Sequence, residues 1–377
     1  MSIQLNSWRR CVRRTMASAV LLSLGSPALA VDNLPKFPPG AVWNRNISNA
    51  PLNINSGSMI STLSNPAGLN GWGNGNKFQI DFSIVVVHAA PNAPTKPLIG
   101  WPSPAEYAYG GPDCDAPGMQ IPVPVGGAIE GSAGYTCTHD NDDCHYIVVQ
   151  GNNLFEAYKA NVTAQGLESL CAMVWHLDKV YPPEGRGEQC TSVDAAGFPV
   201  GALLFNPDDI TAALLQGANS DLGHAIRFVL PNDHIANARY VHPGSHGTKP
   251  PGGASGPTGP TGTIPYASRL RLKTPYQYMA TYNAAAQVIL RTMQRYGIVL
   301  ADGGNIALTA ESDQFNTVKW NDPTINIDSQ TFNPHGASQP GIKVTDFDVV
   351  ETGDQIPVTY DCVRGPDDFI YIDRFDY

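Results

Sequence analysis

The sequence lacks the compact signatures that identify several large enzyme classes. It contains no G-x-S-x-G elbow, no H-E-x-x-H zinc motif and no P-loop. It also has no C-x-x-C pair, which disfavours a zinc site. These absences leave carbohydrate-active enzymes open, because their sites often leave no compact signature in the sequence.

Long apolar runs are missing as well. Only 15% of the 377 residues are charged, yet no segment beyond the amino terminus is long and apolar enough for a membrane-spanning helix. The first 30 residues combine four arginines, a short apolar stretch at 17–25 and the A-x-A pattern Ala28-Leu29-Ala30. We therefore expect residues 1–30 to be a cleaved signal peptide and the mature protein to be secreted or periplasmic.

Positive charge is scarce in the expected mature chain. Removing the four arginines of residues 1–30 from the 23 basic residues leaves 19, against 33 acidic residues, and a net charge of about −14. Such a surface repels nucleic acids and anionic membranes. We expect neither to be a partner of the mature protein.

An even number of cysteines follows the expected cleavage point. An even count in an exported chain indicates disulfides, and six cysteines allow 15 pairings. Nearness in sequence favours Cys137–Cys144 and Cys171–Cys190, which leaves Cys114–Cys362 as the third pair.

Short β-prone runs recur between turn signals, in a chain with 37 glycines and 32 prolines. They lie at 78–88, 145–150, 224–230, 269–273, 297–301 and 368–373. The first run alternates apolar and polar residues, as a half-buried strand does. We predict a mainly β fold, a β-sandwich or barrel-like domain, with a few helices and disulfide staples.

Helical patterns are fewer. The segments 281–297 and 206–218 predict helices, with Gly297 at the carboxyl-terminal cap and Asp208 or Asp209 at the start of the second. The segment 162–178 is ambiguous. We expect one domain over residues 31–377, interrupted by a Gly/Pro-rich loop at 247–265.

The stretch CTHDNDDCHYIVVQ, residues 137–150, places an acidic loop between two cysteines. Closely spaced carboxylates suit Ca²⁺, and Asp140, Asp142 and Asp143 are the candidate ligands. The run lacks the spacing and distal glutamate of an EF-hand, so we favour a disulfide-closed turn. We expect no other metal and no cofactor.

His145 opens the strand-like run of this stretch, and Glu156 follows the turn Gly-Asn-Asn on what would be the second strand of a hairpin. A histidine and a carboxylate on adjacent strands can serve as an acid/base pair. The alternatives are a core histidine and an edge-strand ion pair. The register of the hairpin decides whether the two side chains share a face.

Three further carboxylates stand in β-like or turn contexts: Glu130, Asp81 and Asp194. Glycoside hydrolysis uses two carboxylates roughly 5–9.5 Å apart. Any one of these carboxylates can equally be structural.

The segment GHAIRF offers His224 and Arg227 as substrate-binding residues. Trp72 belongs to a group of aromatic residues in irregular segments, which can stack on sugar rings or plug the ends of a sandwich.

Six segments occur in a fixed order along the chain: VWNRNISNAPLNINSGSMI, DCHYIVVQGNNLFEAY, TSVDAAGFPV, GHAIRFVLP, YASRLRLK and RYGIVLADGGN. Together, over roughly residues 42–350, they resemble a family of exported bacterial proteins with the motifs W-N-x-x-I-S, R-H-x-L-V-V-D, A-D-A-A-G and H-A-L-R-F. The resemblance implies no particular activity. It raises the standing of the site candidates inside these blocks: His145, Glu156, Asp194, His224 and Arg227.

This chain departs from the family's pattern at two positions. Cys144 stands where the family tends to have arginine, and Gln150 where it tends to have aspartate.

These features predict an exported enzyme that acts on a polysaccharide or oligosaccharide, most simply a glycoside hydrolase. Glu156 with Glu130 or Asp81 would be its acid/base and its nucleophile or second base. His145, His224 and Arg227 would orient the substrate or tune the carboxylates. A polysaccharide lyase is the second hypothesis, with Arg227 or Lys159 neutralising a uronate. A non-catalytic carbohydrate-binding or envelope protein is the third.

Overall fold

The computed structural model describes residues 33–102, 112–137, 143–248 and 256–364. Several sequence predictions lie outside these ranges: the signal peptide 1–30, the calcium candidates Asp140 and Asp142, the strand at 368–373 and part of the loop 247–265. Within the described ranges the chain is mainly β, with nineteen strands in five sheets and four α-helices. The β-rich, disulfide-stapled fold is therefore confirmed. Several strand pairs are parallel, and nothing in the sheets confirms the sandwich or barrel form.

The largest sheet has six strands in the order β1-β16-β11-β15-β14-β17. Their bounds are β1 (Ile80–Ile84), β16 (Leu308–Glu311), β11 (Ile226–Leu230), β15 (Ile298–Gly303), β14 (Arg269–Leu272) and β17 (Phe347–Val349). β11 is parallel to β15 and antiparallel to β16, and all five of its residues are buried. A strand buried on both faces explains why the sequence there is apolar without strict alternation.

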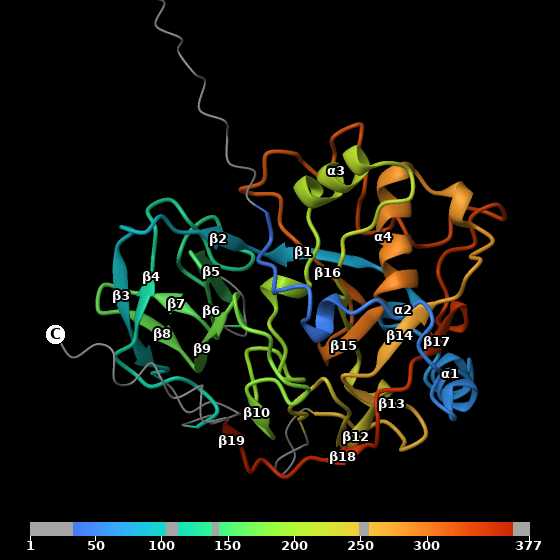
Figure 1. The fold of residues 1–377 in the computed structure, drawn as a ribbon, viewed down its shortest axis with the longest axis horizontal. Coiled ribbons are helices and arrows are strands. Elements are labelled where there is room, and N and C mark those ends of the chain that lie inside the picture. The colour runs from blue at the N-terminus through green and yellow to red at the C-terminus, as the bar shows by residue number, and fades with distance from the viewer. Residues whose placement is uncertain (1–32, 103–111, 138–142, 249–255, 365–377) are drawn as a thin grey trace, which may run out of the picture. The chain divides into compact units, whose positions relative to one another are not determined.

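Four α-helices accompany this sheet in the described residues: α1 (Ser56–Ser64), α2 (Gly73–Asn76), α3 (Pro207–Gln216) and α4 (Ala284–Arg295). α3 and α4 contact each other, and α4 also packs on β14 (Figure 1). Asn283 caps the amino terminus of α4, where its side chain accepts a hydrogen bond from the backbone N–H of Ala286. It ends just before Gly297, whose φ of 74° is the left-handed conformation that the sequence predicted there. α3 is capped by Asn206, and Asp208 and Asp209 occupy its first turn.

A four-stranded sheet follows the order β2-β5-β6-β9, with β2 (Val86–His88), β5 (Tyr146–Gln150), β6 (Asn153–Tyr158) and β9 (Cys171–His176). The hairpin predicted from His145 to Glu156 is present as β5 and β6, with Ile147 opposite Glu156. The predicted strand at 78–88 is in fact two strands, since β1 joins the six-stranded sheet and β2 joins this one. The break falls at Val85, so one run of the chain ties the two sheets together.

Three smaller sheets complete the β structure. The first has four strands, in the order β4 (Gln120–Pro122), β3 (Thr95–Gly100), β8 (Leu167–Ser169) and β7 (Asn161–Val162). The second has three, in the order β13 (Ile264–Tyr266), β12 (Ile235–Tyr240) and β18 (Ile356–Pro357). The third pairs β10 (Gly187–Glu188) with β19 (Val363–Arg364). Short 3₁₀ helices lie at Val42–Asn44, Gly201–Leu203, Asn232–His234, Met279–Thr281 and Val344–Asp346. The ambiguous segment 162–178 therefore contributes strands, β8 and β9, and no helix.

The disulfides are Cys137–Cys144, Cys114–Cys171 and Cys190–Cys362. The first agrees with the sequence prediction, but the pairs Cys171–Cys190 and Cys114–Cys362 are wrong. Backbone pairing decides the partners, because the residue after Cys114 donates its N–H to the carbonyl of Ala172. In the same way, β19 pairs with β10 and brings Cys362 to Cys190.

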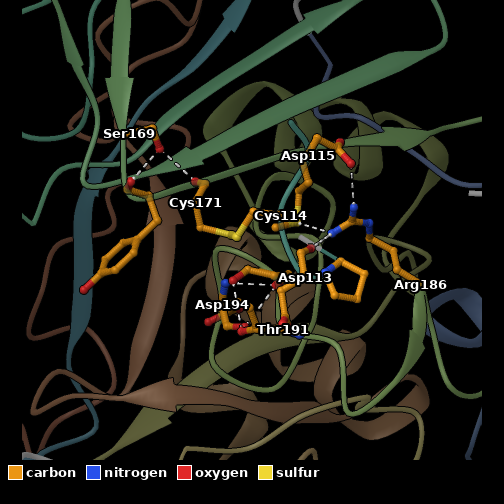
Figure 2. The surroundings of a disulfide bond; sticks show 12 residues. Asp113, Cys114, Asp115, Ser169, Cys171, Arg186, Thr191 and Asp194 are labelled. Atoms are coloured by element: carbon orange, nitrogen blue, oxygen red, sulfur yellow. Dashed lines mark hydrogen bonds and ion pairs between the residues drawn. A yellow bond between two sulfur atoms is a disulfide. The ribbon is translucent and has the colours of Figure 1, made fainter. Parts of the chain in front are cut away.

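Figure 2 shows the Cys114–Cys171 bond and the charged groups beside it. Arg186 donates to the carbonyl of Asp113 at 3.0 Å and to Asp115 Oδ1 at 3.1 Å. Three disulfides are typical of an oxidising compartment, extracellular or periplasmic. In the described ranges, none of the helices has the length and apolar character needed to cross a membrane.

Candidate active site

A cleft of about 790 Å³ opens between the six-stranded sheet and the edge of the β5–β6 hairpin. Four of the residues proposed from the sequence for glycoside hydrolysis line it: Asp81, Glu130, His145 and Arg227. They come from four separate segments of the chain. The structure therefore brings together most of the carboxylate, imidazole and guanidinium groups that the sequence could only name separately.

Arg227 lies at the floor of the cleft, on β11, and is held by two neighbours. Its Nε and Nη2 donate to the two carboxylate oxygens of Asp194, at 3.1 and 2.8 Å. Its Nη1 donates to Thr309 Oγ1 at 2.6 Å. Burial lowers the pKa of Arg227, but the charge and hydrogen bonds of Asp194 outweigh burial and raise it. Asp194 is fully buried, so it acts on the cleft through Arg227.

Asp81 reaches the same floor from β1, where its backbone lies opposite Thr309. Ser83 Oγ lies 3.0 Å from Asp81 Oδ2 and 2.9 Å from Glu130 Oε1. Asp81 Oδ2 and Glu130 Oε1 are therefore at most about 6 Å apart, the sum of these two lengths. This limit is compatible with the ~5–5.5 Å of carboxyl pairs in retaining glycosidases. Burial raises the pKa of Asp81, and the negative charge of Glu130 adds to this against the hydrogen bonds from Ser83.

Glu130 forms a close ion pair with His145. Glu130 Oε2 lies 2.6 Å from His145 Nδ1 and accepts the backbone N–H of His145 at 2.9 Å. Burial alone would raise the pKa of Glu130, but the charge of and hydrogen bonds from His145 lower it to about 2. Burial likewise opposes the charged form of His145, and Glu130 outweighs it and raises the His145 pKa to about 9.

His145 is surrounded by hydrogen-bond acceptors on both sides of its ring. Nε2 lies 3.2 Å from the carbonyl oxygen of Val193, while Nδ1 faces the Glu130 carboxylate. Both nitrogens must carry a proton to satisfy these acceptors, so the geometry favours the imidazolium ion. His145 is thus arranged to hold Glu130 ionised and in place.

Asp302 is a cleft residue that the sequence reasoning missed. It lies near the end of β15, opposite Val229 of β11, and its Oδ1 accepts the N–H of Gly303 at 2.7 Å. Burial raises its pKa to about 7, and nearby Asp194 adds to the rise while Arg227 opposes it. The segment GIVLADGGN did carry a signal, since a lone aspartate directly follows a buried strand and precedes two glycines. Polar groups at the carboxyl ends of parallel strands are typical site residues.

Glu156 is close to this site but does not line the cleft. The register places it on the same sheet face as His145, because it stands opposite Ile147. Only 1% of Glu156 is exposed; it accepts hydrogen bonds from Trp175 Nε1 at 3.1 Å and from the backbone of Gly201 at 2.8 Å. Burial raises its pKa to about 7. These contacts indicate that Glu156 has a structural role in the protein interior.

The other two proposed substrate-binding residues lie in the interior. Trp72 is 1% exposed, packs against Phe78 and Phe347, and donates its indole N–H to the carbonyl of Ile342 at 3.1 Å. His224 is 4% exposed, and burial lowers its pKa. Neither side chain lines the cleft, so the structure separates them from the candidate site.

In the parts of the chain that the structure describes, no three histidine, cysteine or carboxylate side chains are arranged to hold a metal ion. Of the calcium candidates, Asp143 lines the cleft, and Asp140 and Asp142 lie outside the described residues. The calcium site stays a prediction.

Comparison with known proteins yields no family model, no curated protein and no solved structure that matches the chain. The resemblance in motifs stays an expectation. The activity must therefore be inferred from the chemistry of the cleft.

Proposed function

We propose that the protein hydrolyses glycosidic bonds in this cleft. The observation that carries the proposal is the pair Asp81 and Glu130, whose carboxylates are close together while their pKa values move in opposite directions. Such a pair divides the work of acid and base, because one carboxyl keeps its proton at a pH where the other is ionised.

The roles follow from the contacts. Asp81 gives its proton to the glycosidic oxygen as the bond to the leaving sugar breaks. Glu130, held ionised by His145, attacks the anomeric carbon and forms a glycosyl ester. Water then enters and gives one proton to Asp81 while its oxygen bonds to the anomeric carbon. The ester bond breaks, which returns Glu130 as a carboxylate and releases the sugar. The upper limit of about 6 Å is shorter than the ~6.5–9.5 Å of inverting enzymes and is compatible with the ~5–5.5 Å of retaining ones, so retention of configuration is expected.

Two of the groups that a lyase would use, Arg227 and His145, are poorly arranged for that role, while Lys159 also lines the cleft. A lyase needs a cation to neutralise the uronate and a base to remove the proton beside it. Three N–H groups of Arg227 are already bound by Asp194 and Thr309. His145 has no unprotonated nitrogen to offer when both its acceptors are satisfied.

The test incubates the disulfide-formed protein with a panel of neutral and acidic polysaccharides. New reducing ends report hydrolysis, and ultraviolet absorbance reports the unsaturated product of a lyase. Asp81→Asn and Glu130→Gln are expected to lower kcat at least about 100-fold, as loss of a catalytic acid or nucleophile does. Glu168→Gln is the matched control, because its side chain lies on β8, outside the cleft.

Glu156→Gln distinguishes the catalytic pair proposed here, Asp81 and Glu130, from the pair that the sequence predicted, which includes Glu156. The proposal expects the folded fraction of this variant to keep its kcat, since Glu156 does not line the cleft. A loss as large as that of Asp81→Asn would return Glu156 to the catalytic pair. Unsaturated products would support a lyase, and glycan binding without turnover would support a binding protein.

A further inference from the structure

We propose that the cleft accepts uncharged glycans and excludes uronic acids, and that Asp302 is the residue that makes this selection. The inference rests on the proposed function in taking the cleft as the glycan site. It adds the class of sugar and a specificity-determining side chain.

Two of the three basic groups that line the cleft, Arg227 and His145, are already engaged with protein groups. Arg227 is bound by both oxygens of Asp194 and by Thr309. His145 is bound by Glu130 and by a backbone carbonyl. At either of these two groups, a uronate carboxylate that formed the same ion pair would displace the protein partner and leave a buried carboxylate without its own partner.

Carboxylates outnumber the basic groups around the cleft. Four of them line it, Asp81, Glu130, Asp143 and Asp302, and Asp194 lies directly behind Arg227. The basic lining consists of His145, Lys159 and Arg227. Asp81 is protonated in the proposed mechanism, so once Asp302 ionises four negative groups, counting Asp194, face three positive ones. A further negative charge on the substrate then enters a site whose excess charge repels it.

Asp302 is the carboxylate best placed to act on the substrate. Its Oδ1 accepts the N–H of Gly303, and no side chain of the described residues forms an ion pair with it. The charges that face it are those of Asp194, Arg227 and Asp143. Its carboxyl group is half-buried at the cleft wall, where it can bond to sugar hydroxyls in either protonation state.

Backbone packing fixes the position of Asp302. A Cβ atom at Gly303 would lie 2.5 Å from Asn232 Oδ1, and one at Gly304 would lie 2.9 Å from Val229 Cγ2. The two glycines therefore let β15 end tightly against its neighbours. Because Asp302 is held by its backbone, Asp302→Asn should change the charge of the cleft while the fold is preserved.

The experiment measures binding by calorimetry with hexasaccharides that differ only at C6. The pairs are mannose with mannuronate, galactose with galacturonate, and glucose with glucuronate oligomers. Binding is measured at pH 5 and pH 8 for the wild type, Asp302→Asn and the control Asp354→Asn, whose exposed carboxylate lies outside the cleft.

For at least one pair, the neutral member should bind the wild type at least about tenfold more tightly than its uronate. This ratio should rise between pH 5 and pH 8, as Asp302 ionises. It should fall at least threefold at pH 8 in Asp302→Asn and stay unchanged in Asp354→Asn.

Three results would overturn the inference: uronates binding as tightly as the neutral members of every pair, a ratio that Asp302→Asn leaves unchanged, or no binding by any oligosaccharide. Binding of neutral sugars without release of reducing ends has another meaning. It would remove the proposed hydrolysis and leave the selection of uncharged glycans intact.

Discussion

The ion pair between Glu130 and His145 should contribute strongly to stability, and Glu130→Gln removes it. The pair shifts the Glu130 pKa from 4.5 to about 2 and the His145 pKa from 6.5 to about 9. Each shift corresponds to roughly 3 kcal/mol at 1.36 kcal/mol per pKa unit, and the two shifts describe one interaction, so they are counted once. Breaking a buried ion pair typically costs a similar ~3–5 kcal/mol, because one charge stays buried without its partner.

The effect of Glu130→Gln should depend on pH with a definite sign. The His145 pKa is raised in the folded state, so its contribution is complete below about pH 6.5 and is lost as the pH rises through about 9. The Glu130 pKa is lowered, so its contribution is complete above about pH 4.5 and is lost as the pH falls through about 2. The difference in free energy of unfolding between wild type and variant should therefore be largest between about pH 4.5 and 6.5.

Urea unfolding of the wild type and Glu130→Gln at pH 5.5 and pH 9.5 tests both the size and the sign. We expect a difference of about 3 kcal/mol at pH 5.5 and much less at pH 9.5. The control Glu168→Gln, whose carboxylate accepts a hydrogen bond from Asn161 at 3.2 Å, should show no such pH dependence. A difference below about 1 kcal/mol at pH 5.5, or one that grows toward pH 9.5, would refute the reasoning.

Three further predictions concern parts of the structure outside this pair. Replacing Cys190 and Cys362 by alanine should lower the free energy of unfolding by about 5 kcal/mol, because this disulfide closes a loop of 172 residues. Loss of Cys137–Cys144, which closes 7 residues, should cost about 2 kcal/mol, and urea titrations that gave the reverse order would contradict this. Trp72→Ala should cost about 3–5 kcal/mol by thermal unfolding but leave the glycan affinity of the folded protein unchanged, and a selective loss of affinity would place Trp72 in the site. Lys159→Asn should raise the free energy of unfolding by up to about 1 kcal/mol, because Lys159 has a φ of 49° and asparagine adopts positive φ more readily than lysine. A lower midpoint in urea would show that the side chain of Lys159 contributes more than the backbone strain costs.

The strands were largely predictable from sequence because their patterns are local. The hairpin of β5 and β6 follows from a Gly-Asn-Asn turn between two apolar runs, and α4 follows from its apolar face and Gly297. The division of residues 78–88 between two sheets was not predictable in this way, since both halves carry the same apolar character. The disulfide partners were not predictable for a related reason. The pairing of β10 with β19 joins segments that flank a separation of 172 residues at Cys190–Cys362, so nearness in sequence does not predict it.

In the candidate site, too, the local sequence predicted which residues could do chemistry but not which of them reach the cleft. Asp81, Glu130, His145 and Arg227 were named from their residue type and strand context, and tertiary structure then placed them around one cleft. Glu156 has the same kind of local context as His145 and even shares its sheet face, yet Trp175 and Gly201 cover it. Local pattern thus identifies residues able to do chemistry, while their access to substrate depends on segments distant in sequence.

Asp302 is a residue whose proposed role depends on contacts that are distant in sequence. In sequence it is an aspartate after an apolar run, and its importance depends on the parallel pairing of β15 with β11, which sets it beside the anchored Arg227. Burial raises the pKa of Asp302, and the charges of Asp194 and Asp143, which come from other segments of the chain, add to the rise. The same charges oppose a second anion. An arginine that looked in sequence like a receptor for uronates is therefore occupied by a protein carboxylate. The cleft it lies in is expected to favour neutral sugars for that reason.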